Sequence, residues 1–301
     1  MKSLVGQSME RKPKRSAFRI AWAGISQRGI RWGFFIFVYG MLVILAITMI
    51  FPYVWMIANS LKTIPDFYQH PYSLTPQPPT LTTYYNALTK ARVALYMRNS
   101  ALYTVSVVFI QLLLNSLAAY AFARVEFPGR EQLFMALLAT MMLPGSVTLI
   151  PNFLVAHYLG LTNTYLGVVM PSFAGAFGIF LLRQFFLNIP KELGDAALID
   201  GAGFFSTYWR IMLPLAQPAL ITLGVFVFLS QWNAFVWPLI VLSDWEKYPI
   251  TVGIALFRDM HSVQWPSVFA ASTAVSFPVV LLFFLAQEHV VGGISLSGLK
   301  G

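Results

Sequence analysis

Long stretches without a charged residue alternate along the chain with short polar segments. A helix needs about 20 mostly apolar residues to cross a membrane, and six stretches approach or exceed that length. They are Trp32–Ala58, Ala101–Ala123, Leu133–Ala156, Tyr165–Leu182, Leu215–Leu242 and Val268–Gln287. The third and fourth come from one uncharged run, which a polar turn at His157–Thr164 divides. The pattern therefore predicts an all-α integral membrane protein with six transmembrane helices.

The amino-acid composition excludes an ordinary water-soluble fold. Apolar residues make up 57% of the chain, charged residues only 10%, and the mean hydropathy is +0.68. Soluble domains carry about 25% charged residues, so lipid must solvate most of this surface. The sequence contains no cysteine, which excludes disulfides, thiolate metal sites and cysteine nucleophiles.

Basic residues are concentrated at the beginning of the chain. Eight of the 20 Lys and Arg residues fall in residues 1–31, which we interpret as a basic cytoplasmic arm preceding a six-helix domain at 32–301. The apolar run after the arm is too long for a signal-peptide core of roughly 7–15 residues. With the arm inside, 14 of the 20 basic residues lie inside, which predicts cytoplasmic N- and C-termini. Nucleic-acid binding is the alternative for this arm, but it adjoins a hydrophobic helix, so we expect no nucleic-acid partner.

The segment at 61–100 would then lie on the outer side of the membrane, opposite the cytoplasm. It is rich in proline and tyrosine, a composition that favours extended backbone. A docking surface and a simple connector are equally compatible with it. Prolines inside the predicted spans, among them Pro144, Pro171 and Pro238, are expected to kink their helices.

Residues for catalysis are absent from the predicted spans. No acid, base or histidine lies well inside a span, whereas a membrane enzyme or proton-coupled carrier usually keeps such groups at depth. The four histidines are too scattered for a metal site, and no G-x-x-x-x-G-K-[ST] motif is present. We therefore expect no catalytic, metal-binding or cofactor-binding residue, and an energy source on another polypeptide. A secondary transporter should also show internal symmetry, which is not visible here.

The polar segment at 183–214 separates the fourth and fifth predicted spans. Pro190 can begin a helix, and residues 191–200 carry acids near that beginning, which suits the helix dipole. Gly201 can end the helix through a positive φ. The segment thus predicts a short helix, a glycine turn and a second short helix before Pro214.

Ala196 and Ala197 should give the first of these helices a face with little side chain. Such a helix can enter a groove on a partner protein and act as a rigid lever. It can equally rest on lipid as an amphipathic helix. The residues alone leave both possibilities open.

A motif in this segment favours docking to a partner protein over resting on lipid. The chain reads Asp195-Ala-Ala-x-x-Asp200-Gly201-Ala202, followed by Ile211-x-Leu-Pro214. This resembles the coupling-loop signature of ABC importer permeases, E-A-A, then Gly, then I-x-L-P. Further similar stretches are Ala119-Tyr-Ala-Phe-Ala-Arg124, Phe127-x-Gly-Arg130, Ile189-Pro-Lys-Glu192 and the tail Gly298-Leu-Lys-Gly301. Together they resemble the carbohydrate (maltose-type) branch of that family. Asp195 replaces the usual first Glu, and Glu288-His289 stands where the family commonly has a basic residue.

The resemblance implies a type I ABC importer permease fold with a cytoplasmic coupling helix. It further implies a homologous permease subunit, two ATP-binding cassette subunits that bind ATP and Mg²⁺, and a periplasmic or extracellular solute-binding protein. The residues expected to couple to the ATPases are Glu192, Asp195, Ala196, Ala197, Asp200, Gly201, Ala202 and Pro214. The expected location is a bacterial or archaeal cytoplasmic membrane, and the expected solute is a di-, oligo- or polysaccharide. A glycerol phosphodiester permease of the same family, or a secondary transporter, is the alternative.

Polar and aromatic side chains of the fifth predicted span are candidates for the solute pathway. Gln231, Trp232, Asn233 and Trp237 combine amides with flat indole faces, which suit sugar hydroxyls and sugar rings. On a continuous helix Asn233 and Trp237 share one face, so Asn233 is the preferred candidate. Hydrogen bonding between helices is the alternative for these residues, and it is favoured for Gln111 and Asn115 on the second span, toward the partner subunit.

Overall fold

A computed structural model describes residues 27–90, 92–260 and 264–298 of the chain. Most of the predicted basic arm and the last three residues of the tail lie outside these ranges. The chain divides into two compact units, residues 1–54 and 55–301, so their boundary falls inside the first helix. Unit 1 is, in its described part, one helix that begins with Gln27 and two arginines and is apolar from Trp32 onward. The following paragraphs concern unit 2 unless they state otherwise.

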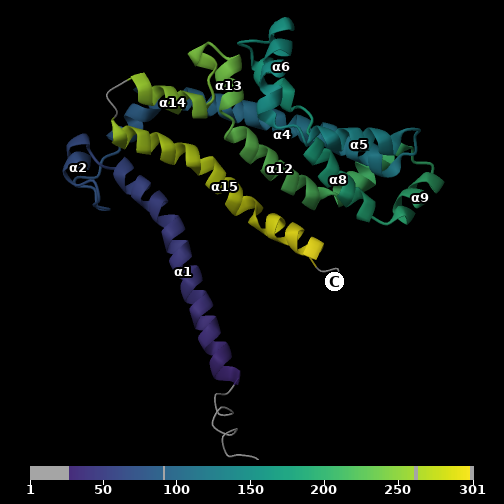
Figure 1. Ribbon diagram of the computed structural model, residues 1–301, viewed down its shortest axis with the longest axis horizontal. Helices are drawn as coiled ribbons and strands as arrows, with labels where there is room; N and C mark the ends of the chain where they lie inside the picture. The colour runs from purple at the N-terminus through teal and green to yellow at the C-terminus, as the bar shows by residue number, and fades with distance from the viewer. Residues whose placement is uncertain (1–26, 91, 261–263, 299–301) are drawn as a thin grey trace, which may run out of the picture. The chain divides into compact units, whose positions relative to one another are not determined.

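Every regular element in the described residues is helical (Figure 1). The α-helices are α1 (Gln27–Ser60), α2 (Ile64–Gln69), α3 (Thr82–Tyr85), α4 (Val93–Arg124), α5 (Arg130–Thr140), α6 (Gly145–Tyr158), α7 (Tyr165–Val169), α8 (Ala176–Asn188), α9 (Lys191–Ile199), α10 (Phe204–Thr207), α11 (Leu213–Leu215), α12 (Gln217–Trp232), α13 (Val236–Val241), α14 (Ile250–Met260) and α15 (Trp265–Gly298). Short π and 3-10 segments are η2 (Asn86–Lys90), η3 (Met170–Ser172), η4 (Tyr208–Met212) and η5 (Trp245–Lys247).

The six predicted spans appear as three continuous helices and three broken pairs. Trp32–Ser60, Val93–Arg124 and Trp265–Glu288 are each long and apolar enough to cross a membrane. The pairs α5 with α6, α7–η3 with α8, and α10–α11 with α12 are bent by 101°, 43° and 77°. Counting each pair as one span gives six among the described residues. The spans predicted at Leu133–Ala156 and Tyr165–Leu182 are therefore broken, and the bend before α12 lies at the edge of the span predicted at Leu215–Leu242.

Two of these breaks fall near a predicted kinking proline. Pro144 is the N-cap of α6 in extended backbone (ψ 135°), so the chain turns sharply after α5. Pro171 lies in the 3-10 segment before α8. By contrast Pro52, Pro151 and Pro278 sit inside helices that continue past them. A proline alone therefore does not fix where a span breaks.

Polar side chains of α4 satisfy the backbone at the break before α8. Gln111 Nε2 donates to the Ser172 carbonyl at 2.6 Å, and Asn115 Oδ1 accepts from the Gly175 amide at 3.1 Å. A Cβ at Gly178 would lie 2.3 Å from the Asn115 amide nitrogen, so only glycine permits this approach. Because unpaired backbone groups are costly in lipid, these bonds make the break tolerable. The side chains thus act within their own chain, rather than toward a partner subunit as expected.

The core of unit 2 is built around α4. Buried side chains from α4, α8 and α12 pack together, including Val107, Leu182, Phe186 and Leu223. Alpha-15 packs along α12 (Figure 1). Several α4 residues at this core are small, such as Ala119, which lets neighbouring helices approach closely.

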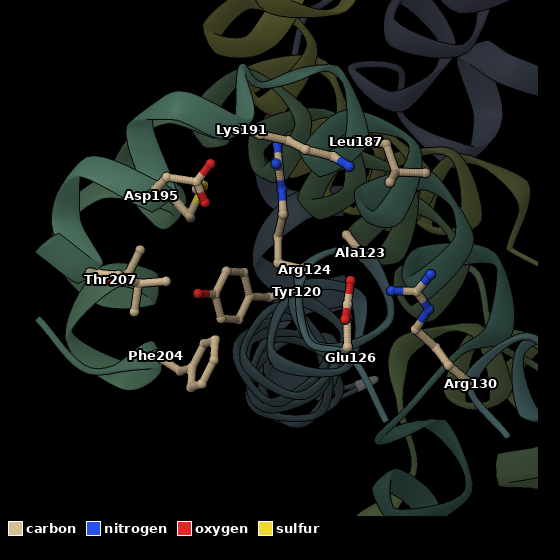
Figure 2. A pocket seen from close by; sticks show the side chains of 13 residues that line it. Tyr120, Ala123, Arg124, Glu126, Arg130, Leu187, Lys191, Asp195, Phe204 and Thr207 are labelled. Atoms are coloured by element: carbon tan, nitrogen blue, oxygen red, sulfur yellow. The ribbon is translucent and has the colours of Figure 1, made fainter. Parts of the chain in front are cut away.

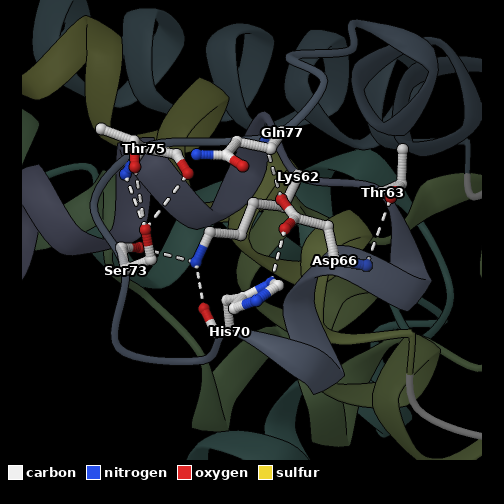
Figure 3. Close-up of polar contacts among 7 residues, drawn as sticks. All are labelled: Lys62, Thr63, Asp66, His70, Ser73, Thr75 and Gln77. Carbon is white, nitrogen blue, oxygen red and sulfur yellow. Dashed lines mark hydrogen bonds and ion pairs between the residues drawn. The ribbon is translucent and has the colours of Figure 1, made fainter.

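The segment after α1 forms a compact loop around a buried charge (Figure 3). Lys62 is fully buried, and its Nζ donates to the carbonyls of His70 at 2.7 Å and Ser73 at 2.6 Å. Asp66, on α2, accepts from the Gln77 amide at 3.0 Å. Its pKa is lowered, mainly by that bond and also by His70 and Lys62. We call residues 61–81 the α2 loop.

Candidate functional site

The segment between α8 and α12 has the predicted helix–glycine–helix form. Pro190 is the N-cap of α9, and Gly201 follows the helix with φ +80°. The Gly201 amide donates to the Leu198 carbonyl at 3.1 Å, and the Ala202 amide donates to the Ala197 carbonyl at 2.9 Å. These two bonds define a Schellman motif, which requires a left-handed residue at the Gly201 position. We call residues 189–216 the α9 loop.

The second half of the α9 loop is anchored on α4. Tyr208 and Met212 of η4 are buried, and the Tyr208 hydroxyl lies 2.7 Å from Ser116 Oγ. The Tyr208 ring also packs on Tyr120, with 5.4 Å between ring centroids. These contacts fix η4 and α11, which contains Pro214, against the core.

The exposed side of the α9 loop carries both charged and apolar side chains. Of the predicted coupling residues, Glu192, Asp195, Ala196, Asp200 and Gly201 are exposed, while Ala202 is half-buried. Ala197 is buried against its own chain, so a smooth face made of both alanines was a wrong expectation. Ile199 is 87% exposed and Phe205 is 67% exposed. Large apolar side chains at this level of exposure indicate a surface that something else covers.

A pocket of about 260 Å³ lies behind α9 (Figure 2). It is lined from α4 by Tyr120 and Arg124, and from α9 by Lys191 and Asp195. Glu126 and Arg130 also line the pocket, so it carries both acidic and basic side chains. Within the described residues, no group of three or more His, Asp or Glu side chains is arranged to hold a metal ion.

Two arginines near this pocket hold the helix ends together. Arg124 Nη2 donates to the Phe186 carbonyl at 2.5 Å and also to the Ile189 carbonyl. Arg183 Nε donates to the Phe122 carbonyl at 3.2 Å, and its Nη2 lies 2.8 Å from Glu131 Oε1. From the sequence, Arg124 was notable only as the end of a family-like stretch, and Arg183 only as the first residue of the polar segment at 183–214. Their position, directly at the end of an apolar run, was the available signal.

The pathway candidates do not lie on one continuous helix. Alpha-12 ends at Trp232, Asn233 is its C-cap, and Trp237 belongs to α13. Pro238 has no amide to donate to the Ala234 carbonyl, and Thr251 Oγ1 donates to that carbonyl instead, at 2.6 Å. The expected shared face of Asn233 and Trp237 was therefore wrong.

The polar atoms of these candidates bind other parts of the chain. Trp232 is buried, and its Nε1 donates to the Val275 carbonyl at 3.2 Å. Trp237 Nε1 donates to the Gly167 carbonyl at 3.0 Å. Asn233 is exposed, with Nδ2 bonded to the Leu229 carbonyl at 2.7 Å, and Gln231 is half-buried. The indole N–H groups thus join helices.

Comparison with known proteins identifies the family. The model of the family described as "Binding-protein-dependent transport system inner membrane component" matches residues 91–295. The chain belongs to this family, and it is a membrane permease of a binding-protein-dependent transport system. The matched region contains the α9 loop, all the predicted coupling residues and the pathway candidates.

Curated relatives resemble the chain over most of its length. The diacetylchitobiose uptake system permease protein NgcG of Streptomyces coelicolor is 32% identical, with 85% of this chain and 86% of the relative covered. The trehalose/maltose transport system permease protein MalG of Thermococcus litoralis is 34% identical, with 86% and 94% covered.

A solved structure has the same fold. The crystal structure of a bacterial ABC transporter involved in the import of the acidic polysaccharide alginate contains a chain with a TM-score of 0.80 to this one. The alignment covers 87% of this chain and 98% of that chain at 24% identity. The all-α, type I permease fold expected from the sequence is confirmed, and the described residues contain three continuous candidate spans, or six if each bent pair counts as one.

Proposed function

We propose that this chain is one of two permease subunits of an ATP-driven importer of sugars. The observation that carries the proposal is the α9 loop, whose helix and glycine turn are anchored on α4 while Ile199 and Phe205 are exposed. In a permease of this family, the exposed side of the loop is where a separate ATPase subunit would dock. ATP and Mg²⁺ would bind to two such ATPase subunits, and this chain would perform no covalent chemistry.

A carbohydrate is the proposed solute. Relatives at 31–34% identity are named for diacetylchitobiose, arabinooligosaccharides and trehalose/maltose. Asn233 is the preferred side chain for solute contact in this proposal, because it is exposed at the end of α12 beside a break in the span. Trp232 and Trp237 would shape the pathway through packing. A solute-binding protein would deliver the sugar from outside.

The proposed orientation places the α9 loop and both termini in the cytoplasm. It rests on the excess of basic residues on that side. Because the chain has no cysteine, single cysteines report cleanly. A Gln77→Cys variant should react with a membrane-impermeant maleimide in intact cells, whereas Pro128→Cys in the turn before α5 should react only after permeabilisation. Labelling of both in intact cells would refute the orientation.

The decisive experiment is reconstitution. The chain is co-expressed with a homologous permease subunit, ATPase subunits and a solute-binding protein from the same organism, purified as a complex and placed in proteoliposomes. Uptake of labelled di- and oligosaccharides should require enclosed ATP and the binding protein. Uptake driven by an ion gradient without ATP would refute the importer proposal. Uptake of a glycerol phosphodiester, with none of any sugar, would favour the alternative solute.

A further inference from the structure

The joint between α8 and α9 is held by a side chain from a different helix. Only Ile189 and Pro190 separate α8 from α9. Arg124, the last residue of α4, donates to the carbonyls of Phe186 and Ile189 at this joint. The last carbonyls of a helix have no partner inside the helix, and a cation there also suits the helix dipole. Arg124 therefore caps α8 while fastening it to α4.

Arg183 makes the complementary connection from α8 to α4. It is buried, and its Nε donates to the Phe122 carbonyl, which belongs to the last turn of α4. Its guanidinium also lies 3.9 Å from the centroid of the Phe134 ring on α5. The bonds from residues 111, 115 and 124 reach progressively later residues of 172–189, so α4 and α8 run in the same direction. The C-terminal ends of α4 and α8, which are the negative ends of their helix dipoles, therefore lie side by side. The arginine of each helix offsets the partial negative charge at the end of the other.

The opposite end of α4 is also fixed by hydrogen bonds. Asn99 Nδ2 donates to the carbonyls of Glu246 at 2.7 Å and Tyr248 at 3.1 Å. The Tyr103 hydroxyl donates to the Lys247 carbonyl at 2.8 Å, and the Ile250 amide donates to Ser100 Oγ at 2.8 Å. Residues 246–250, which run from η5 to the first residue of α14, are therefore attached to the first turns of α4.

Alpha-4 itself is suited to act as a rigid rod. It has 32 residues and contains neither proline nor glycine, which corresponds to a length of about 48 Å. By contrast α1 and α15 each contain a proline, and the other candidate spans of the described residues are broken. Regular, unbroken helix transmits displacement with little loss, whereas breaks and prolines permit bending.

We propose that α4 transmits displacement of the α9 loop to residues 246–250 across the membrane, and that Arg124 is the positioning residue that couples α4 to the α9 joint. The inference rests on the proposed function, because the ATPase subunits supply the displacement. It adds a route by which the solute-binding protein, on the other side, influences ATP hydrolysis. Because one helix would carry displacement in either direction, breaking its attachment at either end should reduce both uptake and the stimulation of hydrolysis.

The test compares variants in the reconstituted complex. Arg124→Gln should assemble with the ATPase subunits and keep its basal ATP hydrolysis. Stimulation of hydrolysis by sugar-loaded binding protein should fall at least about fivefold, and uptake should fall with it. Arg124→Lys keeps a donor for the two carbonyls and should restore part of the stimulation. Arg130→Gln is the matched control, because Arg130 also lines the pocket but its side chain bonds Val125 and Glu131 rather than the carbonyls of the α8–α9 joint, and it should behave as wild type.

A second variant keeps the proposal testable if Arg124→Gln fails to assemble. Asn99→Ala breaks the opposite end of α4, far from the ATPase side, and should also keep basal hydrolysis while losing stimulation. Wild-type stimulation in Asn99→Ala, or an equal loss in Arg130→Gln, would overturn the inference. A wild-type complex without ATP-dependent uptake would instead overturn the proposed function, so the two failures are distinguishable.

Discussion

The α2 loop and the α9 loop both connect membrane spans, yet they differ in whether their charged side chains are buried and bonded or left exposed. The α2 loop folds around its charges, with Lys62 buried and Asp66 bonded to the backbone. The α9 loop buries Tyr208 and Met212 but leaves its acids, together with Ile199 and Phe205, on the surface. Exposed apolar side chains occur in both loops, because Tyr72 is 89% exposed and Leu81 is 71% exposed in the α2 loop. The loops therefore differ in their charged side chains: the α2 loop bonds Lys62 and Asp66 within its own chain, whereas the α9 loop leaves its acids exposed, where a partner can contact them.

Replacement of Gly201 should have the largest effect on the α9 loop. Its φ of +80° suits glycine, and a Cβ there would meet no atom within 4 Å, so the cost of Gly201→Val is backbone strain alone. That strain is about 1–3 kcal/mol and should redirect the chain after α9. We expect uptake to fall by at least about tenfold, a change worth 1.4 kcal/mol, with membrane insertion intact.

Gly203 supplies the control for this prediction. Its φ is −73°, and a Cβ there would also meet nothing within 4 Å. Gly203→Val should therefore retain uptake. Equal uptake in both variants, measured in vesicles with matched protein levels, would show that the left-handed turn is not needed for coupling.

Substitutions at the adjacent residues Ala196 and Ala197 should separate the effect of burial within the chain from the effect of contact with a partner. Ala197 is buried in its own chain, whereas Ala196 is exposed on α9. Ala197→Asp should bury an unpaired charge, at a cost of about 1–3 kcal/mol or more, and so loosen α9 from α10. Ala196→Asp should leave the loop folded but weaken co-purification of the ATPase subunits.

Limited proteolysis of the α9 loop and pull-down of the ATPase subunits measure these two effects separately. Protease sensitivity should rise for Ala197→Asp only. If Ala196→Asp co-purifies the ATPases as wild type does and supports normal uptake, the exposed face of α9 is not the contact, and the contrast between the two loops loses its functional meaning.

The comparison of the two loops also separates what the sequence predicts from what it does not. The short helix from 191, the Gly201 turn and the second helix were predicted because capping and positive φ are local properties of named residues. The six spans were likewise predicted from runs of apolar residues. Both signals lie within a few residues of the feature that they specify.

The features that were missed depend on contacts distant in sequence. The break between Trp232 and Val236 is stabilised by Thr251, which bonds the carbonyl that Pro238 leaves free. Burial of Ala197 results from the packing of α9 on the rest of unit 2. The fastening of α8 by Arg124 joins residues more than 60 positions apart. None of these pairings is visible in local periodicity.

Loss of the buried Lys62 ammonium should affect uptake less than loss of Gly201, and its structural effect should be confined to the α2 loop. Lys62→Met removes the donor to the carbonyls of His70 and Ser73. The Ser73 carbonyl loses this bond, whereas the His70 carbonyl keeps the Ser73 amide as a donor at 3.3 Å. An unsatisfied group costs about 1–3 kcal/mol, so the loop should open to protease and exchange its amide hydrogens faster. Uptake should change less than in Gly201→Val. The control His70→Ala removes a largely exposed side chain and should leave the loop closed, because its carbonyl remains.

Acid should produce the smallest change, again in the α2 loop. The pKa of Asp66 is lowered in the folded chain, mainly by the Gln77 amide, with further contributions from His70 and Lys62. A carboxyl group with a lowered pKa stabilises the fold above its unfolded pKa of about 3.9, and this contribution is lost as the pH falls through the folded pKa. Amide exchange at Gln77, once corrected for its pH-dependent intrinsic rate, should therefore stay constant from about pH 7 to 5 and rise below about pH 4. An Asp66→Asn variant cannot titrate there, so its exchange, corrected for the intrinsic rate, should show no such rise. The α9 loop, whose acids are exposed, provides the internal comparison: an equal acid response at Gly201 would mean that the two loops do not differ in how they hold their charges.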